Sequence, residues 1–515
     1  MFRFSSEKKQ KIIDDAVKNL NQDLGDARLV RSLDTNLDTI NQLFMDVDIL
    51  RTKMVKNRNN ESLRFCIIFC EGVVDNAIIN DNIIRPLMNS SVSMTDKELI
   101  STVMDEIIQI SDMQQTDSLQ SIIEAVSYGS TVLFIDGESS GLILDTKCFT
   151  TRAISEPENE RTLSGPREGF TESMLTNLSM LRRRVRTNKL KMKYYKFGRR
   201  TKTLSCICYM EGVVNKKILA ELYRRLDKID IDGTLDTNYI SELIKDSHLS
   251  PFRTTGYTER PDIVIARLLE GRIALMLDGS PTVITLPFLF IENFQSAEDY
   301  YMNFYYTSFT RMLRIFGFIL TLIVPAFYIA IVAYHHEMLP THLLINITIE
   351  RQGVPFPASI EAFLMLIVFD ILRETGVRMP SNIGQALSIV GALVIGQAAV
   401  EAKFVAAPMV IIVALTGITN LLVPRLSGPV IFFRYIFLLS ASFFGLYGFF
   451  LAVSAAVIHL FNLRSFGVPQ VMAAGNLQYQ EVKDTFFRGP WWTMIKRPRM
   501  LSKNQTRQKT DGDNM

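Results

Sequence analysis

The sequence predicts an α/β soluble N-terminal region of two duplicated subdomains, followed by an all-α polytopic membrane domain. Residues 1–310 mix charged and apolar residues at the density of a globular protein, whereas residues 315–461 contain long stretches almost free of charge. Two motifs also recur within the N-terminal half. The predicted parts are a helical appendage (1–60), a first subdomain (61–150), a basic helical connector (151–199), a second subdomain (200–300), a transmembrane domain (301–461) and a basic tail (462–515).

Composition narrows the functional classes. The 515 residues carry a formal net charge of +3, which gives no indication of a nucleic-acid partner. All five cysteines lie in the N-terminal half, and none forms a CxxC pair. We therefore expect buried, reduced thiols in a cytosolic region, with no metal and no cofactor. The first residues are charged and lack the apolar core of a signal peptide.

The repeat in the N-terminal half consists of two paired motifs. Phe65–Val74 (FCIIFCEGVV) resembles Leu204–Val214 (LSCICYMEGVV), and a helix-like stretch follows each of them. At nearly the same offset, Gly129–Gly137 (GSTVLFIDG) resembles Gly271–Gly279 (GRIALMLDG). Because both motifs recur after nearly the same number of residues, they predict two related subdomains that arose by duplication.

Turn residues follow the apolar runs of the repeat. An Asp-Gly pair between apolar segments is a strong signal for a hairpin, because the turn requires residues that tolerate positive φ. The predicted structural turn residues are Gly72, Gly212, Asp136, Gly137, Asp278 and Gly279.

The connector holds a glycine-containing loop and a basic helix. Gly165 and Gly169 precede a predicted helix that begins at Thr171, a suitable N-cap residue. Two interpretations follow for Arg182–Arg184: an anion site formed with the loop, or a solvated basic helix between the subdomains. The Walker pattern GxxxxGK[ST] is absent from the chain.

Several apolar stretches reach the length of about 20 residues that a membrane-spanning helix needs. These are Ile315–Tyr334, Ile383–Val400 and Phe404–Val423. Val430–Leu460 is too long for one upright helix, so it is either steeply tilted or a hairpin that turns near Gly445–Gly448.

Ser359–Arg373 is short for a span and carries charged residues. Ionisable groups at membrane depth cost about 2.5–3.5 kcal/mol on insertion scales, so they usually face protein or a water-filled path. The pore or gating candidates are Glu361, Asp370, Gln385, Gln397 and Glu401. In the alternative interpretation, Asp370, Arg373 and Glu374 are interfacial residues that form structural pairs.

Basic residues near the spans predict the orientation. Arg311 and Arg314 precede the first span, and the tail is rich in Lys and Arg, so both termini should be cytoplasmic. This requires an even number of crossings, four to six. Six crossings are favoured because they place four further basic residues on the cytoplasmic side: Arg373, Arg378, Arg425 and Arg434.

Specific motifs carry a family resemblance that covers most of the chain. They include Ser164–Glu172 (SGPREGFTE), Thr258–Asp262 (TERPD), Pro355–Met365 (PFPASIEAFLM), Leu372–Pro380 (LRETGVRMP) and the run from Ile383 to Ile411. With these motifs the sequence resembles the A-subunit family of spore germinant receptors, the GerA-type spore germination proteins. Phe369-Asp370 departs from the Phe-Glu expected there, which keeps the charge but shortens its reach.

The resemblance implies a function and a set of partners. It implies a non-enzymatic subunit of a nutrient receptor in the inner spore membrane, working with a permease-like B subunit and a lipoprotein C subunit. It also implies that the subunit forms an oligomer, a nutrient-gated cation channel that triggers germination. The nearest alternative is the sporulation paralogue associated with the dipicolinate-release machinery.

Two other functional classes, a secondary transporter and a membrane-bound enzyme, fit the sequence less well. A secondary transporter would need repeated membrane halves with broken helices, whereas this repeat lies in the soluble half. A membrane-bound enzyme would need a nucleophile–base pattern, a metal motif or a phosphate loop, and the sequence contains none of these.

Overall fold

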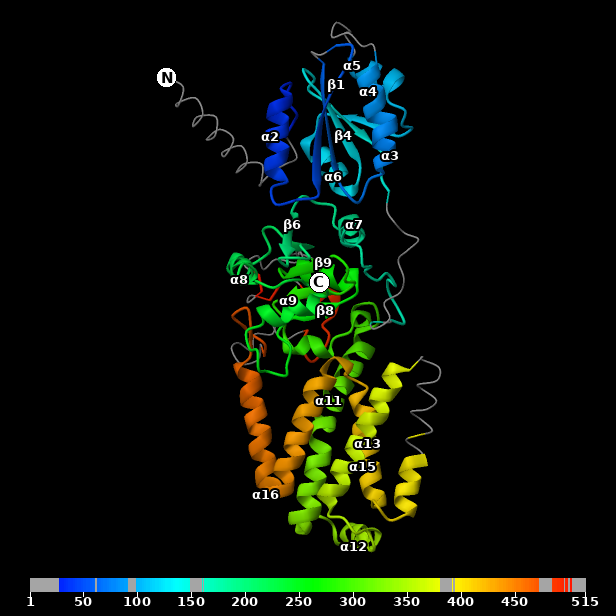
Figure 1. Cartoon of the computed structure of the whole chain (residues 1–515), viewed down its shortest axis with the longest axis vertical. Helices are drawn as coiled ribbons and strands as arrows, with labels where there is room; N and C mark the ends of the chain where they lie inside the picture. The colour runs from blue at the N-terminus through cyan, green and yellow to red at the C-terminus, as the bar shows by residue number, and fades with distance from the viewer. Residues whose placement is uncertain are drawn as a thin grey trace, which may run out of the picture. The chain divides into compact units, whose positions relative to one another are not determined.

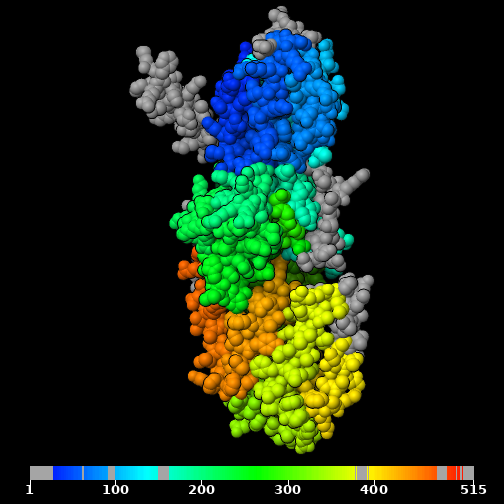
Figure 2. All heavy atoms as spheres, in the orientation of Figure 1, coloured from blue at the N-terminus to red at the C-terminus, as the bar shows by residue number. Residues whose placement is uncertain are grey.

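The computed structural model describes residues 27–60, 63–90, 99–148, 160, 162–379, 391, 394–471, 484–494, 496–498 and 501–502. The chain divides into two compact units. The N-terminal unit contains Met1–Ile244, Thr255–Pro287 and Arg497–Thr506, and the helical unit contains Lys245–Thr254, Phe288–Lys496 and Arg507–Met515. Figure 2 shows their surfaces, with the first described residues of the N-terminal unit in blue and the later helices of the helical unit in yellow and orange.

The N-terminal unit contains two five-stranded antiparallel sheets. The first has the order β1 (Leu50–Lys56), β2 (Arg64–Cys70), β4 (Thr131–Ile135), β5 (Gly141–Leu144), β3 (Met113–Thr116). The second has the order β6 (Leu190–Phe197), β7 (Thr203–Met210), β9 (Ile273–Leu277), β10 (Val283–Leu286), β8 (Gly256–Thr258). The two sheets therefore share one topology, as expected for a duplication.

Each sheet begins before the boundary expected from the sequence. β1 pairs with β2 along its whole length, so the first sheet starts at Leu50 rather than after residue 60. β6 likewise pairs with β7, so Leu190–Phe197 belongs to the second sheet rather than to the connector. β1 has four consecutive exposed residues, which is why its sequence lacks the apolar character of a buried strand.

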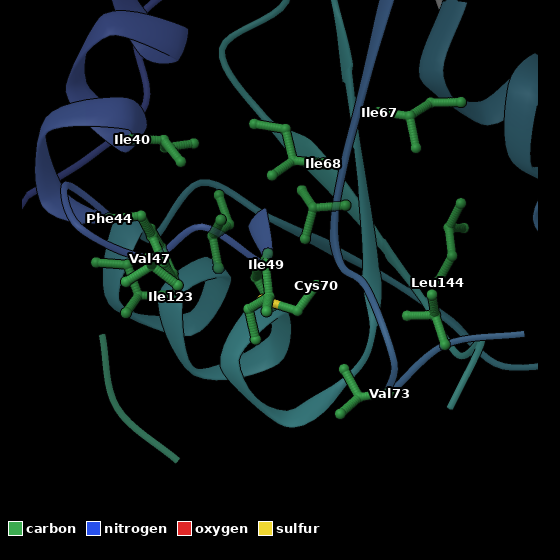
Figure 3. Close-up of a cluster of buried hydrophobic side chains, with 14 of the residues drawn as sticks. Ile40, Phe44, Val47, Ile49, Ile67, Ile68, Cys70, Val73, Ile123 and Leu144 are labelled. Atoms are coloured by element: carbon green, nitrogen blue, oxygen red, sulfur yellow. The ribbon is translucent and has the colours of Figure 1, made fainter. Parts of the chain in front are cut away.

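Helices pack on these sheets and close the core. They are α2 (Leu33–Leu43), α3 (Asn76–Ile78), η2 (Ile79–Ile84), α4 (Arg85–Asn89), α5 (Leu99–Thr102), η3 (Val103–Ile107), α6 (Leu119–Tyr128), α7 (Met174–Arg184), α8 (Lys216–Leu226), α9 (Thr237–Ile244) and α10 (Pro261–Leu269). In the first subdomain, Ile40 of α2 and Phe44, the residue that ends this helix, lie near Ile68 of β2 and Ile123 of α6 (Figure 3). Apolar residues of both subdomains join one continuous cluster of buried side chains.

The repeated motifs occupy equivalent places in the two subdomains. Phe65–Val74 and Leu204–Val214 each contain an inner strand and precede a helix, which Asp75 or Asn215 caps by accepting a backbone N–H. Gly129–Gly137 and Gly271–Gly279 each contain the neighbouring strand and lead by a turn into the next one. The four turn glycines all have positive φ: Gly72 (85°), Gly137 (92°), Gly212 (79°) and Gly279 (87°). At this φ a Cβ atom is strained, so glycine suits these turns.

The thiols of the repeated strands are part of the core. Cys66, Cys70, Cys206 and Cys208 are buried and free, whereas Cys148 is exposed. Burial raises the pKa of the Cys66 thiol to about 12. A thiol of this kind stays protonated at neutral pH and is a poor nucleophile.

The connector residues pair within the unit, which corrects both interpretations of the basic helix. α7 begins at Met174 with Ser173 as the N-cap residue, because the backbone of Thr171 is instead bonded to the side chain of Asn177. Glu168 accepts from Arg183 at 2.5 Å and from Arg184 at 2.6 Å. Arg182 is fully buried and donates to the carbonyl of Thr187. These arginines therefore form neither a solvated face nor an open anion site.

The helical unit contains α11 (Phe304–Tyr334), η6 (His336–Met338), α12 (Thr341–Arg351), α13 (Ala358–Arg378), α15 (Ala407–Asn420), η7 (Pro424–Leu426) and α16 (Ser427–Asn462) (Figure 1). Short elements precede and follow them: η4 (Phe290–Phe294), η5 (Ala297–Tyr300), β11 (Arg464–Ser465), β12 (Val468–Pro469) and η9 (Trp491–Thr493). Among the described residues, Phe304–Tyr334 and Pro424–Asn462 are long and apolar enough to cross a membrane.

α16 is a helical hairpin. Gly445 has non-helical angles (φ 59°, ψ −140°) and interrupts the helix. The rings of Phe433 and His459 lie 6.3 Å apart, although 26 residues of straight helix would separate them by about 39 Å. Phe437 and Phe449 also meet across the turn, at 6.4 Å. The structure thus has the hairpin of the two alternatives for this segment, and not the tilted helix.

Small residues allow the other helices to approach closely. Gly317 of α11 lies against Thr419 and Leu422, and Thr321 donates to the hydroxyl of Thr419 at 2.8 Å. Gly417 of α15 faces the ring of Phe369 on α13. These contacts pack α15 against both α11 and α13.

Candidate functional site

Glu361 ties together three helices of the helical unit. It lies in the first turn of α13, and it is only 1% exposed. Its carboxylate accepts from Nη2 of Arg351, at the end of α12, at 3.3 Å. It also accepts from the backbone N–H of Ala406, just before α15, at 3.0 Å. Through these hydrogen bonds, Glu361 links α13 to the end of α12 and to the start of α15.

Asp370 forms a second charged centre on the same helix. Its carboxylate oxygen Oδ2 accepts from Nη2 of Arg434 and, at 2.8 Å, from the hydroxyl of Tyr435. Arg434 and Tyr435 lie on the first arm of the α16 hairpin. Asp370 is about 18 Å from the first residue of α13 and about 12 Å from the last, at roughly 1.5 Å per residue. The pair therefore joins the middle part of α13 to α16.

The Asp370–Arg434 pair uses only part of its bonding capacity. Among the described residues, Nε and Nη1 of Arg434 and Oδ1 of Asp370 have no hydrogen-bond partner. A guanidinium can donate five hydrogen bonds, and an arginine–carboxylate pair often forms two in parallel. Buried polar atoms without partners are costly. The pair therefore makes fewer hydrogen bonds than a parallel arginine–carboxylate pair would.

A surface cavity, wide open on one side, adjoins Asp370. Its volume is about 650 Å³, and it lies between α13 and the first arm of α16. Its lining is apolar in part (Phe363, Ile367, Ile371, Ile431) and polar in part (Asp370, Arg373, Glu374, Thr375, Tyr435). Carboxylate and hydroxyl oxygens are the ligands that hard cations prefer. If Arg434 moved away, Asp370 and Tyr435 would offer such oxygens to a hydrated cation in this cavity.

The other predicted pore residues lie elsewhere. Gln397 donates to Glu401 at 3.0 Å, and both side chains are exposed. Gln385 lies outside the described residues. Glu361 and Asp370 have separate sets of partners. Among the described residues, Glu361, Asp370 and the Gln397–Glu401 pair are thus separate polar centres, and their role as pore or gating residues stays a prediction.

Sequence reasoning missed the basic partners in these centres. Arg351 was not considered, and Arg434 was used only to predict orientation. The available signal was a lone arginine inside the apolar stretch Val430–Leu460. Its burial depends on α13 lying beside α16, which no local pattern reveals. Within the described residues, no cluster of three or more His, Cys, Asp or Glu side chains could hold a metal ion.

Comparisons with known proteins place the chain in a family. Residues 37–500 match the family model described as Bacillus/Clostridium GerA spore germination protein. The "Uncharacterized membrane protein YfkQ" of Bacillus subtilis is 42% identical over 85% of each chain. "Spore germination protein KA" of B. subtilis is 40% identical over 87% of this chain and 83% of its own length.

Further similarities are with another germination protein and with a solved structure. "Spore germination protein GerLA" of Bacillus cereus is 36% identical over 85% of this chain and 89% of its own. The crystal structure of the N-terminal domain of the A subunit of the Bacillus megaterium spore germinant receptor GerK3 is 32% identical, covers 51% of this chain and 98% of that one, and gives a TM-score of 0.42. By the family model and by these identities, the chain belongs to the GerA family of spore germination proteins.

Proposed function

We propose that this protein is the A subunit of a nutrient receptor in the inner spore membrane, and that copies of it form a nutrient-gated cation channel. Its partners are a permease-like B subunit and a lipoprotein C subunit. Membership of the GerA family supports the receptor role. The observation that carries the channel role is the buried, incompletely bonded Asp370–Arg434 pair beside a cavity.

The arrangement of the helices supports six crossings in the membrane domain, residues 301–461. They are α11, α13, the apolar stretch 383–400, α15 with its apolar flanks, and the two arms of α16. Because α16 is a hairpin, it contributes two crossings and returns the chain to the side where it began. An even number of crossings leaves the N-terminal unit and the basic tail on one side. We place that side in the cytoplasm because Arg311 and Arg314 precede the first span.

Gating follows from the chemistry of the pair. In the described state Arg434 occupies the carboxylate of Asp370 as a tethered cation. Relative movement of α13 and α16 would remove the guanidinium and leave the Asp370 carboxylate open to a mobile cation. Moving Arg434 away from Asp370 breaks one charged hydrogen bond, because only one of the donor atoms of Arg434 is bonded to the carboxylate.

The receptor role is tested by germination of spores that lack the gene, with each nutrient supplied separately. Loss of the response to one nutrient or one set of nutrients, with the others intact, is the expected result. A uniform slowing with every nutrient would contradict the receptor role and favour the paralogue of the dipicolinate-release machinery. Restoring the gene should restore the lost response and serves as the control.

A further inference from the structure

An aromatic surface surrounds the start of α11 in the helical unit. We call it the aromatic collar, and its exposed members are Tyr305, Tyr306 and Phe309 of α11 with Phe486, Phe487, Trp491 and Trp492 of segment 484–494. Tyr305 is 74% exposed and Trp492 is 59% exposed. Soluble surfaces rarely gather so many large apolar rings, and such patches usually mark an interaction site.

Buried ion pairs hold segment 484–494 against α11. Arg311, which is fully buried, donates to the Asp484 carboxylate and carbonyl at 3.0 Å, and also to the buried carboxylate of Asp299. Tyr300 donates to the Asp484 carboxylate at 2.8 Å. Together with the bond from Nε to Asp299, these bonds give each guanidinium nitrogen of Arg311 an acceptor and fix the segment beside the helix.

Contacts between aromatic rings also hold segment 484–494 beside α11. Phe304 and Trp492 meet edge to face at 5.8 Å, and Tyr300 and Trp491 lie 6.0 Å apart. The two tryptophans, which are far from α11 in sequence, thus lie beside its first turn. Segment 484–494 and α11 therefore form one aromatic surface.

The collar continues into the exposed face of the predicted span. Phe309, Met312, Leu313, Phe316 and Ile319 are all exposed, and their spacing places them on one face of α11. In a membrane this face meets lipid chains, and the collar lies where the face begins. Trp and Tyr combine an apolar ring with a polar edge, and they concentrate at the headgroup level for that reason.

We propose that the aromatic collar lies in the headgroup region of the bilayer, with segment 484–494 as an interfacial anchor that sets the depth of α11. This proposal rests on the membrane placement in the proposed function. The occupant is lipid rather than a second protein, because the collar is continuous with the lipid-facing side of α11. Through Arg311, Asp299 and Asp484, the anchor also ties the tail to the helix that begins the membrane domain.

The sequence provides a direct probe. The chain contains only two tryptophans, and both belong to the collar. The full-length protein is reconstituted into phosphatidylcholine vesicles whose acyl chains carry bromine either near the headgroup or near the methyl end. We expect bromine near the headgroup to quench the tryptophan fluorescence at least about twofold more strongly than deep bromine. Absence of quenching by either lipid would overturn the proposal and show that protein or water covers the collar.

A second variant separates this proposal from the membrane placement itself. In the triple variant Trp491→Phe/Trp492→Phe/Phe316→Trp, the only tryptophan lies on the exposed face of α11, about 18 Å along the helix from its first residue. Brominated lipid should quench this tryptophan, because the exposed face of α11 meets lipid chains in the proposed placement. If this variant is quenched but the native tryptophans are not, only the collar proposal fails. If neither is quenched, the membrane placement fails as well.

Discussion

Arg260 in the N-terminal unit and Arg434 in the helical unit are both fully buried, but they are bonded very differently. Arg260 immediately precedes α10 and donates to both carboxylate oxygens of Asp262. It also donates to the carbonyls of Glu160 and Pro166 and to the hydroxyl of Thr162. Arg434 makes one carboxylate contact, and its Nε and Nη1 have no hydrogen-bond partner within the described part of the chain.

The difference separates a structural arginine from one suited to movement. Arg260 holds the connector against α10 through bonds that would all break together. Arg434 would lose one charged hydrogen bond and a ring contact with Tyr435 if α13 and α16 moved apart. A fully satisfied buried charge resists rearrangement, whereas a partly satisfied one has less to lose.

Replacing Arg260 should have the largest effect on stability. Arg260→Met leaves the carboxylate of Asp262, which is also buried, without its arginine. Breaking a buried ion pair in this way costs about 3–5 kcal/mol. Hydrogen exchange of β8 and α10 in the full-length protein should show a matching loss of protection. The matched control is Arg200→Met, which removes an exposed, 3.8 Å ion pair and should change protection little. Equal effects of the two variants would refute the structural role of Arg260.

Replacing Arg434 should reduce the stability of the protein less than replacing Arg260. Arg434→Met removes one hydrogen bond to a charged group, worth roughly 1.5–3 kcal/mol, and Asp370 can then be hydrated from the adjoining cavity. Thermal unfolding of the detergent-solubilised protein should therefore show a smaller loss for Arg434→Met than for Arg260→Met. If Arg434→Met lost as much thermal stability as Arg260→Met, Arg434 would be as firmly bound as Arg260. The proposed difference between the two arginines would then be wrong.

The smallest expected effect comes from the partly exposed Glu168. Burial favours its neutral form, but hydrogen bonds from Arg183 and Arg184 outweigh burial and lower the pKa of the Glu168 carboxyl. The resulting stabilisation is complete above the unfolded-state pKa of about 4.3 and is lost as the pH falls through the lower folded-state pKa. Acidification should therefore reduce the free energy of unfolding more in the wild type than in Glu168→Gln, by less than about 1 kcal/mol.

The control for this pH dependence is Glu106→Gln, which changes an exposed carboxylate of η3. It should leave the acid profile of the wild type unchanged. If Glu168→Gln also leaves the profile unchanged, the ion pairs with Arg183 and Arg184 contribute nothing to stability.

Local signals in the sequence predicted much of the N-terminal fold. The apolar runs that include Ile67 and Ile207, and the turns at Gly137 and Gly279, occupy equivalent positions in two sheets of one topology. The edge strand β1 was missed because its residues are mostly polar and exposed. Strands of that kind are recognised by their neighbour in the sheet rather than by their own composition.

Of the residues in the candidate site, only the acidic ones were predicted from the sequence. Glu361 and Asp370 stood out because carboxylates are rare in apolar segments. Arg434, 64 residues beyond Asp370, matches the pattern of a basic residue at a membrane boundary. Only the packing of α13 against α16 shows that its charge is buried and paired. Periodicity identifies the helices, but it does not say which of them are neighbours.

The central claim is that Arg434 closes a cation path by occupying the Asp370 carboxylate. The most direct test measures potassium release before any nutrient is added, from spores with wild-type protein, with Arg434→Met, and with Asp370→Asn/Arg434→Met. Immunoblots of the inner membrane establish that all three proteins are present at equal levels. We predict release without nutrient from Arg434→Met spores and much less from the double variant, which lacks the carboxylate. Release from Arg434→Met spores that stays at the wild-type level would contradict the account.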